Sequence, residues 1–408
     1  MSKVGSTMPE TVGASHPAGS LPLVTRLWLA GMAAILLILW GALGYLSAAD
    51  EARGIPVGIF RIQPSLAISS QYDDNVYRSG TQRLSDKVLS VRPVVQFSTH
   101  WKKLTFQTSV STTIDHYEKQ TNLDATNSSA NMGVKYAASR DLSLSFDGGV
   151  DFNHDAPGAP DVGTVSTTET PKQWKHYQFG GKAQYTFHRF RSEFGLTHGV
   201  DAKQQVGNYW NQATMTLMYA LAPRTSLLTG LGWKGIVYDD SSLHRDSQEK
   251  SANVGVNWAA TAKTQGDLRV GYTVKDTENP TGSSPGMVSF GGGVSWKPLA
   301  KTGLSLDLNR SFAEGGLVAD YYKTTSAAVG LNQQLRSFLS LKSKVGYTKN
   351  DYSSGQENDT WKETIGIDYA FPRWLTMSTS VGRTNQKSSL PSANYDDNQV
   401  MISLTGGL

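Results

Sequence analysis

The chain has 408 residues, no cysteine, 40 glycines and a hydrophobic fraction of 38%. Its formal net charge is only +4, and lysine and arginine are scattered along it, which excludes a basic arm for nucleic-acid binding. The absence of cysteine excludes a disulfide framework and any thiol-based metal site or catalysis. A hydrophobic fraction this modest suits a membrane barrel, which needs apolar residues only at every second position.

The N-terminal segment differs from the rest of the chain. An uncharged apolar stretch follows Arg26 and ends at the small residues Ser47, Ala48 and Ala49. This pattern predicts a leader over residues 1–49 that ends in a signal peptide, cleaved before Asp50 on export. The alternative is an inner-membrane anchor, because the stretch is long enough to span a bilayer as a helix. No second run of this kind follows, so a polytopic helical protein is excluded.

From about residue 57 onward, apolar and polar residues alternate. In residues 104–115 the even positions are mostly apolar and the odd positions are polar, and the same alternation recurs in 141–152, 176–187, 268–274, 288–296 and 365–371. Such a period of two predicts strands with one apolar and one polar face. We expect the following residues to face lipid: Phe106, Leu144, Phe179, Val270 and Ile367.

Short turns and longer polar loops alternate between these strands. Short turns are predicted near residues 100–103, 139–140, 188–189, 222–224, 262–264, 297–298, 335–336 and 372–373. Longer loops include residues 73–86, 153–172, 239–250, 275–286, 348–359 and 384–396. Outer-membrane barrels have short periplasmic turns and longer external loops. The pattern therefore predicts an all-β fold over residues 50–408, a transmembrane antiparallel up-and-down β-barrel of about 18 strands with both termini periplasmic.

Aromatic residues gather at the two ends of the predicted strands. Beside the short turns are Trp101, Tyr136, Phe187, Phe190, Tyr219, Trp258, Trp296, Phe338, Phe371 and Trp374. Toward the other ends are Phe152, Tyr177, Tyr209, Tyr238, Tyr272, Tyr321, Tyr347 and Trp361. Two rings of amphipathic aromatics are typical of the two membrane interfaces. The alternative is that strands simply favour aromatic residues.

A barrel of about 18 strands has a bore too wide for side chains to fill, so its lumen holds water or an inserted segment. Loop 153–172, with Pro157, Pro160 and Pro171, is the candidate to fold inward, and a solvated external loop is the alternative. The predicted lumen face carries both signs of charge, on Arg92, Lys135, Asp147, Lys182, Arg191, Glu193, Arg269, Asp307, Lys342, Lys344 and Asp368. Because these charges form no ring of one sign, we expect the lumen to pass a neutral polar solute, or polar solutes with only weak selectivity.

The first and last strands carry similar acidic tetrads. The first runs up to Tyr72-Asp73-Asp74-Asn75, and the last runs down from Tyr395-Asp396-Asp397-Asn398. If both termini are periplasmic, these strands are neighbours and the carboxylates of Asp73, Asp74, Asp396 and Asp397 meet at the external rim. Oxygen-rich clusters suit Ca²⁺ or Mg²⁺, which predicts a weak cation site or a rim that shares cations with lipopolysaccharide phosphates. The alternative is that these residues merely suit turns.

Signals for catalysis are missing. The eight histidines have no metal-ligand spacing, and the glycine run at residues 291–293 lies within a predicted strand. Serine, histidine and carboxylate residues offer no reason to choose a catalytic triple. We therefore predict a protein that is not an enzyme and that needs no cofactor beyond the divalent cation considered above.

The start of the barrel region resembles a known family. Residues 61–66 (RIQPSL), 71–78 (QYDDNVYR), 85–86 (SD) and 91–95 (VRPVV) look like the opening of outer-membrane β-barrel porins of the BBP2 type. These include the EpsL-like proteins that accompany exopolysaccharide biosynthesis. The resemblance implies an outer-membrane barrel, often associated with polysaccharide export, and assigns no catalytic residues.

Three functions remain open from the sequence. The leading hypothesis is a conduit or accessory barrel for exopolysaccharide export, which implies a polysaccharide synthesis and export machinery as partner. The second is a general or sugar-selective diffusion porin for uptake. The third is a structural barrel with a closed lumen.

Overall fold

The structure is a computed structural model that describes residues 54–160, 170–203, 206–259, 261, 263–278, 284–371 and 374–408. The predicted leader, residues 1–49, lies outside the described residues. The chain divides into two units, Met1–Arg53 and Gly54–Leu408, and the second contains all the described elements. None of the helices in the described ranges has the length and apolar character needed to cross a membrane.

The described part of the chain is almost entirely β-structure. A short strand, β1 (Ile55–Val57), precedes 18 long strands. These are β2 (Phe60–Asp73), β3 (Asp86–His100), β4 (Leu104–Tyr117), β5 (Ala125–Ala137), β6 (Leu142–His154), β7 (Gln173–Phe187), β8 (Phe190–Ala202), β9 (Asn208–Ala222), β10 (Thr225–Tyr238), β11 (Ser247–Trp258), β12 (Thr264–Thr277), β13 (Gly286–Leu299), β14 (Thr302–Glu314), β15 (Tyr321–Arg336), β16 (Leu339–Tyr352), β17 (Glu357–Ala370), β18 (Leu375–Ser388) and β19 (Tyr395–Gly407).

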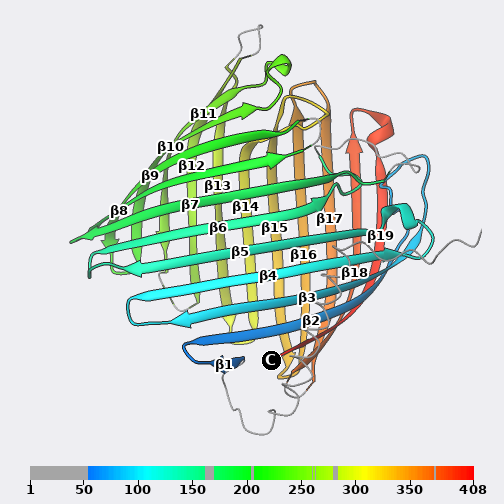
Figure 1. Cartoon of the computed structure of the whole chain (residues 1–408), viewed down its shortest axis with the longest axis horizontal. Coiled ribbons are helices and arrows are strands. Elements are labelled where there is room, and N and C mark those ends of the chain that lie inside the picture. The colour runs from blue at the N-terminus through cyan, green and yellow to red at the C-terminus, as the bar shows by residue number, and fades with distance from the viewer. Residues whose placement is uncertain are drawn as a thin grey trace, which may run out of the picture. The chain divides into compact units, whose positions relative to one another are not determined.

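The long strands form one closed antiparallel wall. Each strand from β2 to β19 pairs with the next strand in the sequence, and β19 pairs with β2 to complete the ring (Figure 1). The closing register runs from Gln399 opposite Asp73 to Gly407 opposite Ser65. Beyond the end of β19, β1 forms a hairpin with the start of β2. The predicted barrel of about 18 antiparallel strands is confirmed.

The alternating sequence explains why the wall has two different faces. Directly paired residues on neighbouring strands share a face. The apolar set continues from strand to strand: Ile68 pairs with Leu404 on one side and with Val91 on the other. Three residues predicted to face lipid, Phe179, Val270 and Ile367, belong to this apolar set and are 53%, 51% and 47% exposed. A continuous exposed apolar band is what a bilayer requires of a barrel's outer face.

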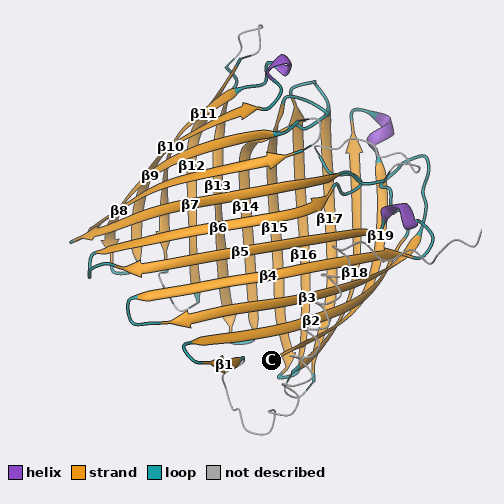
Figure 2. Ribbon diagram, viewed as in Figure 1, coloured by secondary structure: helices purple, strands orange, loops and turns teal. Residues whose placement is uncertain are grey.

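The connections also follow the predicted alternation. One end of the barrel carries eight connections of two to five residues, such as 188–189 and 300–301, and the other carries nine that include 74–85 and 155–172. Within the described residues, three short 3-10 turns are present, and all lie in connections of the second end, which we call the outer mouth (Figure 2). The predicted loop 348–359 is much shorter than expected, at residues 353–356, because β16 and β17 remain paired up to Asp351 and Glu357.

Candidate functional site: the lumen and the outer mouth

The polar face of the wall lines the lumen, because the apolar face must contact lipid. Small hydroxyl side chains form hydrogen bonds with one another on this face, as between Ser111 and Ser129 (2.8 Å) and from Thr273 to Ser289 (3.0 Å). The strand register places every charged residue predicted for the lumen on the same face. They are Arg92, Lys135, Asp147, Lys182, Arg191, Glu193, Arg269, Asp307, Lys342, Lys344 and Asp368.

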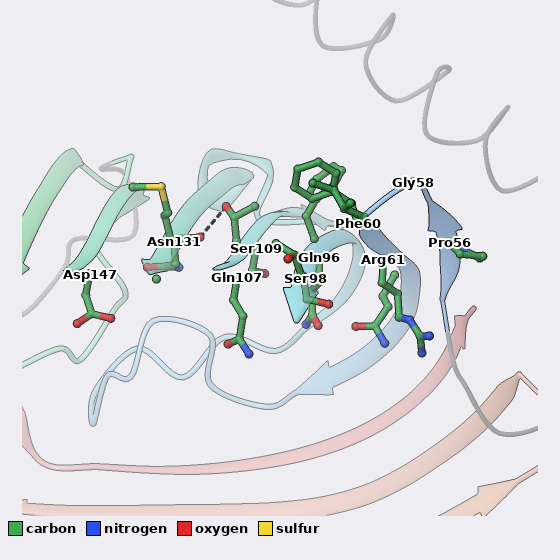
Figure 3. Close-up of a pocket in the computed structure, with 17 residues that line it drawn as sticks. Pro56, Gly58, Phe60, Arg61, Gln96, Ser98, Gln107, Ser109, Asn131 and Asp147 are labelled. Atoms are coloured by element: carbon green, nitrogen blue, oxygen red, sulfur yellow. Dashed lines mark hydrogen bonds between the residues drawn. The ribbon is translucent and has the colours of Figure 1, made fainter. Parts of the chain in front are cut away.

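The lumen wall is polar and of mixed charge. Lys342 pairs with Asp368 across β16 and β17, with nitrogen and oxygen 2.5 Å apart, and Arg269 lies 3.6 Å from Asp267 on its own strand. Toward the end opposite the outer mouth, a cavity of about 1000 Å³ is lined by Gln63, Gln96, Gln107 and Asp147 among others. In Figure 3, Gln107 and Asp147 extend from one side of the sheet while Phe60 extends from the other. Such a surface can donate and accept hydrogen bonds without favouring one sign of charge.

At the outer mouth, the closure of the ring brings three of the four predicted acidic residues together. Carboxylate oxygens of Asp73, Asp74 and Asp397 lie within 4.8 Å of one another. The fourth residue, Asp396, does not join them, so the expected four-carboxylate cluster is wrong. Its side chain accepts a hydrogen bond from Asn385 (2.6 Å) and lies 3.5 Å from Arg383. Asp396 and Asp397 are consecutive in β19, and consecutive strand residues point to opposite faces.

An arginine supplies positive charge to this cluster. The Nη1 atom of Arg78 lies 3.1 Å from Asp73 and 2.9 Å from Asp397, and it also donates to the backbone oxygen of Asn75 (2.8 Å). Asp73 and Asp397 are 3% and 0% exposed, so this ion pair is screened little by water. Burial and the neighbouring Asp73 raise the pKa of Asp397 to about 7, against the lowering effect of Arg78. A proton on Asp397, together with Arg78, therefore relieves the repulsion between these two carboxylates without a metal ion. A divalent cation bound beside Asp74 remains a proposal.

Asp74 joins the two ends of the barrel chain. Its carboxylate accepts hydrogen bonds from the backbone N–H and the side-chain amide of Asn398, both at 2.8 Å, and forms an ion pair with Arg83. Partial burial opposes ionisation of Asp74. The hydrogen bonds from Asn398 and Arg83 outweigh burial and hold the pKa of Asp74 below its usual value.

Several described segments of the outer-mouth connections fold over the lumen. Val76 and Tyr77 from the β2–β3 connection pack with Leu123 against Tyr117, a lumen-facing residue of β4. Residues 155–160 of the β6–β7 connection reach β16, where the Tyr352 hydroxyl donates to the backbone oxygen of Pro160 (2.9 Å). Residues 155–160, within the predicted loop 153–172, thus lie over the lumen.

A second group of connections meets on another part of the rim. Arg245 of the β10–β11 connection donates to Asp320 (2.8 Å) and to the backbone oxygen of Gly316 (2.7 Å) in the β14–β15 connection. Below them, the buried Lys275 contacts Glu314 (2.7 Å) and Glu249 (3.1 Å). Together with the β6–β7 segment, these contacts narrow the outer mouth.

Sequence reasoning missed the arginines that organise the mouth. Arg78 lies in the segment 71–78 that carries the family resemblance, and Arg83 lies five residues further on. Both are in a predicted loop, where no periodicity indicates the direction of a side chain. Their spacing from Asp73 and Asp74 is the only signal that could have suggested an ion pair.

The closed wall, the apolar outer face and the polar lumen define an outer-membrane β-barrel of the porin class. The chain belongs to the family described as "Putative beta-barrel porin 2", which matches residues 48–407. It is thus an outer-membrane, porin-like β-barrel channel, in contact with membrane lipid on one face and hydrophilic solute on the other.

Solved porin structures have similar barrels. The chain is similar to OpdL of Pseudomonas aeruginosa (8% identity, 86% of this chain and 99% of that chain covered, TM-score 0.46). It is similar to OpdK of the same organism with vanillate (12% identity, 85% and 98% covered, TM-score 0.46). It is also similar to a BenF-like porin of Pseudomonas fluorescens (11% identity, 85% and 99% covered, TM-score 0.46). No curated protein has a significant sequence match to the chain.

Proposed function

We propose that the barrel conducts neutral or weakly charged, hydroxyl-rich solutes, and that secreted exopolysaccharide is its physiological solute. The supporting observation is the lumen wall, where both signs of charge alternate with serine, threonine, asparagine and glutamine. Side chains of this kind exchange hydrogen bonds with sugar hydroxyls without holding an ion of one sign. On this proposal the barrel works with a polysaccharide synthesis and export machinery and has no catalytic activity of its own.

The channel itself is tested in planar bilayers with the purified barrel. We expect stepwise conductance in KCl and a reversal potential close to zero in a KCl gradient, because the lumen charges are mixed. Strong selectivity for one ion sign would contradict the neutral-solute proposal. Absence of any conductance would instead favour a structural barrel with a closed lumen.

The export assignment is tested in cells. Deleting the gene should lower secreted polysaccharide while intracellular polysaccharide precursors accumulate, and the wild-type gene should restore secretion. A deletion strain with normal secretion would contradict export.

A second candidate function is uptake of small polar solutes through a diffusion porin. The observation that favours it is the narrowed outer mouth, where residues 155–160 lie over the lumen. A narrow mouth suits a short oligosaccharide better than a long polymer. Slower growth of the deletion strain on oligosaccharides, with normal polysaccharide secretion, would select uptake over export.

A further inference from the structure

The apolar face of the wall has a hollow across β6 to β10, strands that lie side by side (Figure 1). Its volume is about 600 Å³. Small residues alternate with large ones across it: Gly181 lies between Phe146 and Leu196, and Ala213 lies between Leu196 and Trp233. The small side chains leave the backbone uncovered between the large ones, which produces the hollow. We call it the outer-face groove.

The groove is on the lipid face rather than in the lumen. Gly181 follows the lipid-facing Phe179 by two residues, so both belong to one face of β7. The groove extends along β7 from Phe179 to Ala183, which is roughly 13 Å of strand. A barrel's apolar band is about 25 Å tall, so the groove has the length of an acyl chain in one leaflet.

A polar pair lies at the outer-mouth end of this groove. Nδ1 of His198 and Oδ1 of Asn211 are 2.8 Å apart, and both residues line the groove. The strand partners of His198 are Phe179 and Asn211, so the pair belongs to the apolar face. The centre of the His198 ring lies 5.1 Å from that of Phe179 and 6.4 Å from that of Tyr209. A polar pair on a lipid face is costly, and such residues in a membrane mark functional sites.

The pair keeps both a donor and an acceptor for a ligand. Oδ1 of Asn211 can only accept, so Nδ1 of His198 donates to it, and Nε2 is left as an acceptor in the neutral ring. Nδ2 of Asn211 is left as a donor. Neither atom has a hydrogen-bond partner in the part of the chain that the structure describes. An amide or a hydroxyl at the head of an acyl chain can satisfy both atoms, whereas an ester carbonyl can only accept.

A lysine supplies positive charge beyond the outer end of the groove. Lys175 precedes Phe179 by four residues on β7, so it belongs to the same face, nearer the outer mouth. Its ammonium group lies over the ring of Phe152, 5.9 Å from the ring centre, and forms no ion pair with a carboxylate of the described residues. A lysine at a membrane surface attracts the phosphates of anionic lipids.

We propose that the outer-face groove binds lipopolysaccharide, with one acyl chain in the groove, the amide or hydroxyl of that chain at His198 and Asn211, and a phosphate at Lys175. From the outer mouth inward, the wall presents a positive charge, a donor–acceptor pair and an apolar hollow. An acylated, phosphorylated lipid of the external leaflet has the complementary groups in the same order. Ester-linked phospholipids lack the donor for Nε2 of His198. The site is on the opposite face from the lumen, so this inference goes beyond the channel function and is independent of the solute.

Three substitutions test the three parts of the site. Ala213→Leu fills the groove, Asn211→Leu removes the free donor, and Lys175→Gln removes the charge. All three change side chains on the outward face, where they displace no packed core. The full barrel is purified in detergent and incubated with lipopolysaccharide of truncated sugar chain. Native mass spectrometry then counts the lipid molecules that each barrel retains.

Two matched controls change the same residue types outside the groove. Ala252→Leu adds the same volume on the outward face of β11, between Leu231 and Tyr272. Lys87→Gln removes a lysine near the outer mouth on β3, where Tyr72 is its strand partner. Phosphatidylglycerol is the comparison lipid, because it has a phosphate and ester-linked chains but no amide.

We expect the wild type to retain one lipopolysaccharide molecule. Each of the three groove variants should bind it roughly three- to tenfold more weakly, which corresponds to the loss of one or two hydrogen bonds or of one charged contact. Both controls should match the wild type. Phosphatidylglycerol should be retained less than lipopolysaccharide, and Asn211→Leu should not change its retention.

Unchanged retention of lipopolysaccharide in all three groove variants would overturn the site. Equal losses in the groove variants and their controls would also overturn it, because the effect would then come from the outward face in general. If phosphatidylglycerol were retained as well as lipopolysaccharide, and lost in the same variants, lipopolysaccharide would be the wrong occupant. Conductance is measured separately, so failure of the lipid site leaves the channel function standing.

Discussion

Asp74 and Asn398 hold the two ends of the barrel chain together at the outer mouth. The backbone N–H and the side-chain amide of Asn398 both donate to the Asp74 carboxylate at 2.8 Å, and the N–H of Asp74 donates to the Asn398 oxygen at 3.1 Å. These residues are 324 positions apart in the sequence. Closure of the ring is therefore secured at its rim by a charged residue as well as by the strand pairing below it.

Replacing Asp74 with alanine should weaken this closure. The variant loses hydrogen bonds to a charged acceptor, which are worth roughly 1.5–3 kcal/mol each in favourable settings, so we expect a total loss of about 1–3 kcal/mol at this partly exposed site. The measurement is the free energy of unfolding in urea, in detergent or lipid. Asp396→Ala is the matched control, since the Asp396 side chain contacts Asn385 and Arg383 of the neighbouring strand β18 and takes no part in the contact between Asp74 and Asn398. Equal losses in the two variants would contradict a special role for Asp74.

The same contact predicts a pH dependence. The pKa of Asp74 is lowered in the folded barrel, so its carboxylate stabilises the fold above the ordinary pKa of 3.8, and this stabilisation disappears as the pH falls through the lower, folded pKa. The stability difference between the wild type and Asp74→Asn should be constant near neutral pH and shrink below about pH 4. Thermal unfolding between pH 7 and pH 2.5 measures it. A difference that persists at the acidic end would show that ionisation of Asp74 is not its source.

Arg78 predicts how the mouth responds to divalent cations. In the wild type the guanidinium already forms ion pairs with both Asp73 and Asp397 and occupies the space between them, so we expect excess Ca²⁺ to change the unfolding temperature little. In Arg78→Gln the freed carboxylates can bind Ca²⁺ with oxygen ligands, and the cation should restore part of the lost stability. The double variant Arg78→Gln, Asp397→Asn should lose this response. Clear stabilisation of the wild type by Ca²⁺ would instead support the cation site proposed from the sequence.

The barrel could be predicted from the sequence because its rules are local. A period of two separates the lipid face from the lumen face, and the alternation of short connections with mostly longer ones counts the strands. These signals placed Val270 on the apolar face and Asp147 on the polar face without knowledge of any contact. The prediction that the first and last strands are neighbours needed only one assumption, that an even number of antiparallel strands closes into a barrel.

Details of the mouth could not be predicted in the same way. Arg78 and Arg83 lie in connections, where the direction of a side chain depends on contacts with distant strands. The prediction that the carboxylates of Asp396 and Asp397 lie together was wrong. The period of two could have excluded it, because consecutive strand residues point to opposite faces. The contact of Pro160 with Tyr352 has no sequence signal, since it depends on how far the connection reaches over the lumen.

The two faces of the wall should respond differently to a new charge. Val270 lies on the apolar face between its strand partners Val254 and Phe290, and it is 51% exposed. An arginine at this position would contact hydrocarbon and should cost roughly 2–4 kcal/mol near the bilayer midplane. The control is Thr216→Arg, where the new side chain faces the lumen beside its cross-strand partner Glu193. Water and the neighbouring carboxylate should keep the cost of this change well under that of Val270→Arg. Reversible unfolding from lipid vesicles measures both variants, and equal losses of stability would mean that the two faces have been assigned incorrectly.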